Sequence, residues 1–94
     1  MSGFDSNWNI GIMQYEVDDF EGMIDSFTKY INEEKPSKNW LAEAYYFIGL
    51  GNLNLNRFGT AIENFTLAIN NFASHNYFFA FFNRGICFTE LELY

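Results

Sequence analysis

Cysteine, proline and histidine each occur once in this chain of 94 residues, and basic side chains occur five times. The single cysteine, Cys87, excludes a disulfide within the chain. The twelve acidic residues leave a formal net charge of −7, and an acidic surface of this kind repels polyanions. We therefore expect no nucleic-acid partner and no adsorption to an anionic membrane.

Two kinds of targeting segment are also lacking. Apolar runs fall short of the ~18–20 residues of a membrane-spanning helix, and the N-terminal residues do not pair a positive charge with the apolar segment of a secretory signal. We therefore expect a cytoplasmic protein that does not enter a membrane.

Motifs for catalysis or metal binding are missing as well. His75 falls in a predicted loop and Cys87 in a helix pattern, so we expect neither a metal site nor a His-assisted nucleophile. The acidic cluster at 16–25 lacks the central glycine and ligand spacing of a calcium loop, which favours a solvated hairpin corner. Segment 49–51 lies in a helix pattern and lacks the following residues of a phosphate loop. We expect no enzyme, no cofactor and no metal.

Apolar and aromatic side chains are abundant instead. Hydrophobic residues make up 49% of the chain and aromatic residues 21%, with twelve Phe, six Tyr and two Trp. Each buried aromatic removes roughly 150–250 Å² from water, so even a short chain can build a core. This composition indicates one small folded unit.

The spacing of apolar residues predicts an all-α chain of five helices, at about 6–17, 19–32, 37–54, 57–72 and 77–91. Pro36 breaks the pattern after the second helix, because proline cannot continue a helix. Ser37 is the expected N-cap of the third helix. The connections within each helix pair are very short, which makes paired helices antiparallel neighbours.

Three glycines recur near the middle of helix-patterned stretches, at Gly11, Gly49 and Gly85, with spacings of 38 and 36 residues. The first two are each followed twelve residues later by Met23 and Ala61, and four residues after that by an aromatic, Phe27 or Phe65. A small residue in mid-helix allows two antiparallel helices to approach closely. Spacings of this length are typical of stacked helical repeats.

On these residues the chain resembles the tetratricopeptide repeat family, whose unit is a helix–turn–helix of 34 residues with aromatic and small residues at fixed positions. The central repeat matches at Tyr45, Ile48, Gly49, Phe58, Ala61, Phe65 and Ala68. The last stretch matches a first helix at Asn83, Arg84, Gly85 and Phe88. The first repeat is looser: Ile10, Gly11, Phe20 and Phe27 match, whereas Asn7, Met23 and Tyr30 depart from the pattern. Because Met23 and Tyr30 replace small residues, we expect the helices of this repeat to pack more widely or to be held by other contacts.

The resemblance implies one domain over 1–94, a right-handed stack of antiparallel helix hairpins of the TPR-like solenoid type. Its units would span about 4–37, about 42–75 and a half repeat at about 78–94. The implied function is a non-catalytic protein–protein interaction module, an adaptor or chaperone-like protein that takes an apolar helical or extended segment with some basic residues into a concave groove.

By register with the family, the groove would be lined by Trp8, Ile12, Tyr15, Tyr46, Leu50, Leu53, Phe79, Phe82 and Ile86. Its edge would carry Asp5, Glu16, Glu43, Asn54 and Glu90. A contiguous apolar patch on a protein surface usually marks an interaction site. The alternative is that some of these aromatics belong to the core, since the rotation of each helix is not fixed by sequence.

A second function stays open because the last repeat lacks its second helix. Three residues would face the missing helix: Phe81, Phe88 and Leu91. A two-fold homodimer through this last helix is the natural closure, and the protein would then be a self-assembling structural protein. A chain cut from a longer repeat array is a further alternative.

Overall fold

The computed structural model of the protein describes residues 6–71 and 77–92. In these ranges the chain forms five helices and no strand: α1 (Asn7–Glu16), α2 (Phe20–Glu34), α3 (Lys38–Asn54), α4 (Phe58–Asn71) and α5 (Phe78–Glu90). The expected all-α chain of five helices is confirmed for the described residues, and each helix bound lies within two residues of its predicted place.

Polar side chains fix where the first helices begin. The Ser6 hydroxyl accepts a hydrogen bond from the Asn9 backbone N–H at 3.2 Å, and the Asp19 carboxylate accepts one from the Gly22 N–H at 3.0 Å. Both satisfy backbone donors that the first helical turn leaves without a partner. Ser37 precedes α3 as predicted, but its side chain makes no capping hydrogen bond.

The turn at the end of each odd-numbered helix has the same backbone geometry. Asp18, Asn56 and Glu92 have left-handed φ values of 61°, 60° and 58°, and they are spaced 38 and 36 residues apart, like the three glycines. Their backbone N–H groups donate to the carbonyl three residues earlier in all three turns, at 3.2, 3.0 and 3.0 Å. The local structure therefore recurs along the chain with the period of the sequence.

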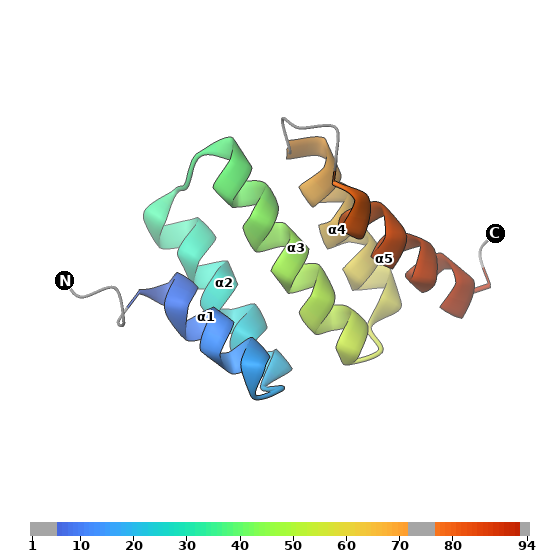
Figure 1. Ribbon diagram of the computed structural model, residues 1–94, viewed down its shortest axis with the longest axis horizontal. Coiled ribbons are helices and arrows are strands. Elements are labelled where there is room, and N and C mark those ends of the chain that lie inside the picture. Colours follow the sequence, from blue (N-terminus) through green and yellow to red (C-terminus); the bar gives the residue numbers. More distant parts are fainter. Residues whose placement is uncertain (1–5, 72–76, 93–94) are drawn as a thin grey trace.

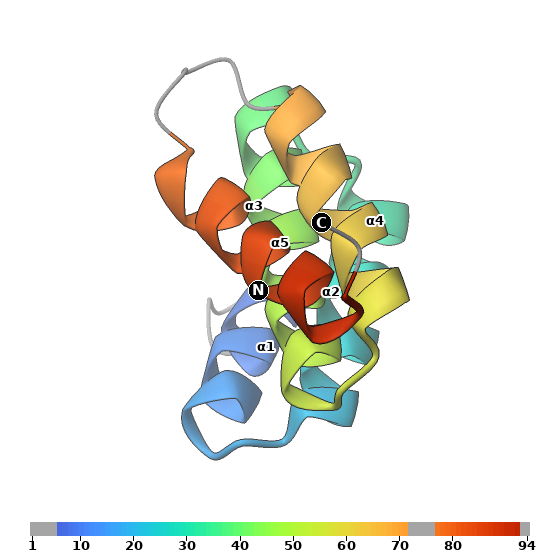
Figure 2. The same ribbon diagram turned by 90° about the vertical axis from the view of Figure 1, so that its right-hand side faces the viewer.

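Helices pack against their neighbours in sequence, α1 on α2, α2 on α3, α3 on α4 and α4 on α5, with a smaller contact between α3 and α5. Figure 1 shows the helices side by side along the long axis of a body of 46 × 28 × 18 Å. Figure 2 shows α1, α3 and α5 toward one side of this body and α2 and α4 toward the other. The described helices therefore form two layers.

Glycines set the distance between the helices of each pair. A Cβ atom on Gly11 would lie 2.7 Å from the Phe27 ring, and one on Gly49 would lie 2.7 Å from the Phe65 ring. Both rings are fully buried. No other residue type leaves space for a ring at these positions, so the close approach predicted from the glycine spacing is confirmed for the second pair. In the first pair, where Met23 and Tyr30 predicted wider packing, the approach is equally close, because the Phe27 ring fills the space over Gly11.

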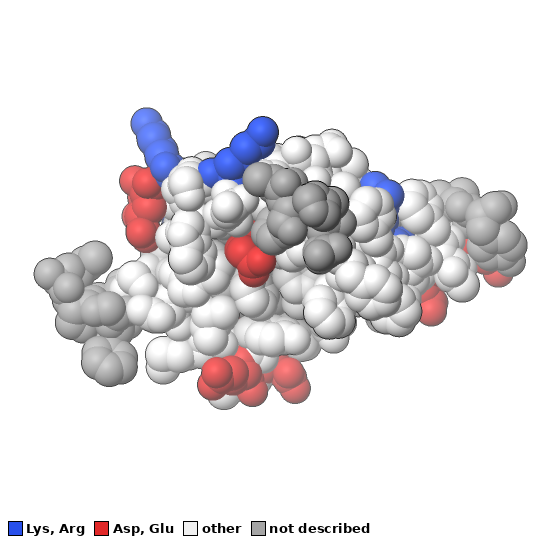
Figure 3. All heavy atoms as spheres, turned by 45° about the horizontal axis from the view of Figure 1, so that its top comes forward, with Lys and Arg blue, Asp and Glu red and all other residues white. Residues whose placement is uncertain are grey.

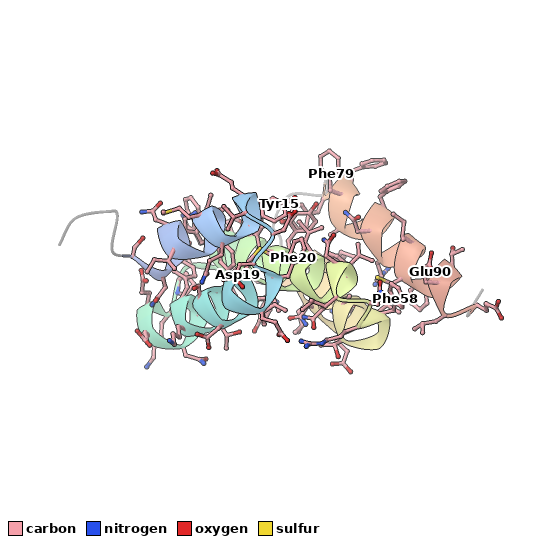
Figure 4. The ribbon with its side chains drawn as sticks, turned by 90° about the horizontal axis from the view of Figure 1, so that it is seen from below. Tyr15, Asp19, Phe20, Phe58, Phe79 and Glu90 are labelled. Carbon is pink, nitrogen blue, oxygen red and sulfur yellow. The ribbon has the colours of Figure 1, made fainter. Side chains whose placement is uncertain are left out.

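The second helices begin with an aromatic residue at the corner of the hairpin. Phe20 and Phe58 are the first residues of α2 and α4, and both pack half-buried against the core. Figure 4 shows these two corners from below. Between the hairpins, the Phe27 ring stacks on Phe47 with centroids 4.9 Å apart and planes 8° from parallel. Gly51 brings α3 close to Ile24 of α2.

We predict that Gly49→Ala lowers the free energy of unfolding by about 1–3 kcal/mol, because the new Cβ has to displace a fully buried ring. Gly59→Ala is the matched control: a Cβ there meets no atom within 4 Å, and the change is expected to stabilise by about 0.5 kcal/mol. Urea unfolding followed by circular dichroism measures both. A Gly49→Ala variant as stable as the original chain would show that this contact does not set the helix spacing.

Candidate protein-binding surface

The structure places five of the nine predicted groove residues in or against the core. Leu50 is buried, and four others are half-buried and pack on the buried cluster: Trp8, Ile12, Tyr46 and Leu53. Most of their apolar surface is therefore already in contact with the chain's own helices.

Trp8 is the centre of an aromatic cluster that joins α1, α2 and α3. Its ring makes edge contacts with Phe27 at 5.1 Å, Tyr30 at 5.0 Å, Trp40 at 5.2 Å and Phe47 at 5.8 Å between centroids. Edge-to-face packing of this kind is the favourable arrangement of aromatic pairs. Trp8 therefore holds the first hairpin against the second.

Tyr46 likewise packs between helices, in the second half of the chain. Its ring lies 5.8 Å from Phe65 and 5.3 Å from Tyr77. Its hydroxyl accepts a hydrogen bond from the Asn83 side-chain amide at 3.3 Å, and burial is the main cause that raises the pKa of this hydroxyl. Tyr46 thus connects α3 with α4 and α5.

The described residues of the predicted groove edge also divide into exposed and half-buried ones. Glu16 and Glu90 are exposed, and the exposed Asn54 donates from its side-chain amide to the Leu50 carbonyl at 2.8 Å. Glu43 is half-buried; it lies beside Tyr77, whose pKa is raised far above its usual value by burial first and then by the charge of Glu43. Asp5 lies outside the described residues, as does His75.

The remaining predicted groove residues are accessible. Tyr15 is 38% exposed, Phe79 63% and Phe82 56%, and Ile86 is half-buried. Figure 4 shows Tyr15 of α1 and Phe79 of α5 on the same side of the ribbon. The structure therefore leaves an apolar surface on the layer formed by α1, α3 and α5, but a smaller one than the sequence predicted.

Four aromatic rings crowd the start of α5. Phe78 and Phe81 are 64% and 49% exposed, next to the exposed Phe79 and Phe82. The Phe78 ring stacks on Phe82 at 5.9 Å and meets Phe79 edge-on at 5.6 Å. Phe78 was missed by the sequence reasoning, although a Phe-Phe-Ala-Phe-Phe run on one helix places rings on more sides than a core can cover.

A hollow of about 580 Å³ lies along α5, lined by Phe81, Phe82, Gly85, Ile86, Thr89 and Glu90. Unlike Gly11 and Gly49, Gly85 has no atom within 4 Å of the place where a Cβ would stand. Phe82 and Ile86, predicted for the groove, thus share this hollow with Phe81, predicted for self-association. The other two predicted self-association residues are not among those that line the hollow: Phe88 is half-buried, and Leu91 is 39% exposed.

Arg84 fixes one wall of this hollow. Its guanidinium lies 5.3 Å from the centre of the Phe81 ring, and it donates a hydrogen bond to the Thr66 hydroxyl of α4 at 3.1 Å. Cation–π contact and hydrogen bond together hold Phe81 toward α4.

Charged side chains are spread along the molecule. On the face shown in Figure 3, uncharged residues cover most of the area and acidic side chains lie in separate groups. The Arg57 guanidinium donates two hydrogen bonds to the Glu21 carboxylate, at 3.0 and 2.6 Å, and lowers the pKa of Glu21. This ion pair joins the starts of α2 and α4 and was missed by the sequence reasoning.

Groups that could do chemistry are sparse in the described part of the chain. No group of three or more His, Cys, Asp or Glu residues there could hold a metal ion. Cys87 is fully buried, and burial, followed by the charge of Glu90, raises the pKa of its thiol. Among the described helices, none has the length and apolarity to cross a membrane.

Comparison of the chain with protein-family models, with curated proteins and with solved structures finds no match.

We predict that the two kinds of groove residue separate by their effect on stability. Trp8→Ala is expected to lower the free energy of unfolding by about 3 kcal/mol, because it removes the centre of an aromatic cluster. Phe79→Ala is expected to change it by less than about 0.5 kcal/mol, since the ring is mostly in solvent. Urea unfolding measures both, and equal losses would contradict the division.

Cys87 reports whether α5 stays docked on α4. We expect a chromogenic disulfide reagent to react with the native chain at least about a hundredfold more slowly than with the urea-denatured chain, which corresponds to an opening cost of about 2.7 kcal/mol. The Cys87→Ala variant supplies the background rate. Native reaction as fast as that of the denatured chain would mean that α5 undocks readily.

Proposed function

We propose that the protein is a non-catalytic protein–protein interaction module that binds an apolar helical or extended segment of another protein. The observation that carries this proposal is the group of rings on α5, of which Phe78 and Phe79 are each nearly two-thirds exposed. Keeping contiguous rings in water is unfavourable, and such patches usually mark interaction sites.

The binding surface in this proposal runs from Tyr15 on α1 to Phe79 on α5, on the layer that these helices share with α3. Aromatic anchors of this kind commonly supply much of the binding energy at interfaces. The net charge of −7 favours a partner segment that carries basic residues beside its apolar anchors. We place this function in the cytoplasm, as the sequence predicts.

We also propose that the hairpins form the right-handed stack implied by the tetratricopeptide resemblance. The recurrent left-handed turns at Asp18, Asn56 and Glu92 support it, as do the ring contacts of Gly11 and Gly49. In such a stack the odd-numbered helices line one face, which is the face that carries Tyr15 and Phe79.

A second candidate function is self-assembly through α5. The observation that favours it is the open hollow beside Gly85, at a position whose counterparts in α1 and α3 are both covered by a ring. The two functions share part of α5, because Phe82 and Ile86, which were predicted for the groove, also line this hollow. They are compatible where the dimer leaves Tyr15 and Phe79 free, and they exclude one another where the second copy occupies the groove.

Binding can be tested with a synthetic 15-residue amphipathic peptide of Leu, Ala and Lys that carries one Phe at the centre of its apolar face. We expect saturable binding in fluorescence anisotropy. Phe79→Ala and Tyr15→Ala are each expected to weaken it about tenfold, or about 1.4 kcal/mol, through loss of an anchor ring.

Leu67→Ala is the matched control variant, since Leu67 is an exposed apolar residue on α4, 41% accessible. A scrambled peptide of the same composition controls for charge attraction alone. Equal binding of the scrambled peptide, or an equal loss with Leu67→Ala, would contradict the proposed surface.

A further inference from the structure

α5 packs on α4 in the way that α3 packs on α2. Ala44 and Ala80 are both fully buried and stand 36 residues apart, as do Gly51 and Cys87, which are buried as well. The inner faces of α3 and α5 are therefore counterparts in the same register. The faces of α3 and α5 that carry Gly49 and Gly85 are counterparts too, because these glycines are also 36 residues apart.

The face of α3 that carries Gly49 is covered by a ring of α4, whereas the face of α5 that carries Gly85 is open in the described structure. On α3, Gly49 receives the Phe65 ring, and the neighbouring Tyr46 ring lies 5.8 Å from it. The counterparts on α5 are Gly85, which has no atom near its Cβ position, and Phe82, which is 56% exposed. The hollow of α5 is thus a place that can receive a ring, with a second ring already beside it.

A second copy of the chain can fill this place only with a ring that is free. The rings that cover glycines within one copy, Phe27 and Phe65, are both fully buried and cannot leave without unfolding their hairpins. The start of α5 offers exposed rings, among them Phe82, which itself lines the hollow. Elsewhere in the described helices the exposed rings are Tyr15 on α1 and Trp40 on α3, one on each helix, whereas α5 exposes four. The helix best able to cover α5 is therefore another α5.

The face of α5 is complementary to itself. Phe82 and Gly85 are three residues apart, so a ring and a space for a ring lie on one side of the helix. When two α5 helices pack antiparallel about a two-fold axis level with residues 83 and 84, each Phe82 meets the Gly85 of the other copy. The same register sets Phe81 against Ile86 and Phe78 against Thr89. Large residues then face smaller ones along the contact.

Charges do not oppose this arrangement. Glu90 is the acidic residue that lines the hollow, and antiparallel packing sets it level with Tyr77 of the other copy. The two Glu90 side chains then lie at opposite ends of the helix pair, roughly 20 Å apart along the axis at 1.5 Å per residue. This separation exceeds the screening length of about 8 Å at physiological salt. Two chains of net charge −7 can therefore meet at this face.

We infer that a second copy of the chain docks on α5 in an isologous dimer, with the Phe82 ring of each copy seated on Gly85 of the other. This inference rests on the self-assembly function proposed above and names its contact. A two-fold contact of this kind closes on itself, because the Phe82 ring and the Gly85 space of each copy are both used in it.

Gly85→Ala tests the contact with a minimal change. Within one copy the new Cβ meets nothing, and alanine favours the helix over glycine, so the melting temperature is expected to stay or rise. Across the dimer the new Cβ would crowd the Phe82 ring, as a Cβ on Gly11 or Gly49 would crowd its ring at 2.7 Å. We expect the dimer dissociation constant to rise at least tenfold, measured by sedimentation equilibrium over a hundredfold range of concentration.

Gly59→Ala is the matched control, because Gly59 also has open space around its Cβ position but lies on α4; it is expected to leave the dimer unchanged. A rescue pair adds a sharper readout. Phe82→Gly and Gly85→Phe are each expected to weaken the dimer, and the two together are expected to restore it, because ring and space merely exchange places across the two-fold axis.

The outcomes are separable. A chain that stays monomeric over the whole range overturns both self-assembly and this contact. A dimer that neither Gly85→Ala nor Phe82→Gly weakens overturns the contact and leaves self-assembly through another surface. Loss of the dimer with Gly85→Ala at an unchanged or raised melting temperature, together with its recovery in the double variant, is the result expected here.

Discussion

The packing of a phenylalanine ring on a glycine is the contact on which the arrangement of this chain depends. Phe27 on Gly11 and Phe65 on Gly49 bring the two helices of each pair so close that a single added carbon would lie 2.7 Å from the ring. Because both rings are fully buried, the same contact fixes the helix spacing and forms the centre of the core. The short left-handed turns at Asp18 and Asn56 make the two helices of each pair antiparallel neighbours, so that the glycine of one helix can meet the ring of the other.

The contact between the hairpins is built on the same ring. Phe27 covers Gly11 with one part of its ring and stacks on Phe47 of α3, 4.9 Å away between centroids. Gly51 lets α3 approach Ile24 on the other side. The second hairpin is therefore positioned by the first, and α5 is positioned by α4 through the counterpart residues Ala80 and Cys87. Gly85 differs from Gly11 and Gly49, because no described atom lies within 4 Å of the place where its Cβ would stand.

Sequence reasoning located the helices well, because apolar periodicity, Pro36 and the short turns act locally. It also located the close helix contacts, because glycine and phenylalanine recur at fixed spacing. It could not locate the surface equally well. With 21% aromatic residues, apolar side chains surround α1 and α3 on most sides, and periodicity then leaves the rotation of each helix open. Trp8 and Leu50 thus turned out to be packed, and the Glu21–Arg57 pair joins residues 36 positions apart.

The two proposed activities use neighbouring parts of one helix, and this has a consequence for both. Phe79 lies on the layer shared with α1 and α3 (Figure 4). Phe82 and Ile86 follow it by three and seven residues, positions that share one face of a helix, and both line the hollow beside Gly85. A dimer formed through Gly85 would cover Phe82 in both copies, so a partner segment that extends from Phe79 along α5 would have to displace the second copy. Self-association would therefore compete with binding of such a segment, and the apparent affinity for it would fall as the dimer forms.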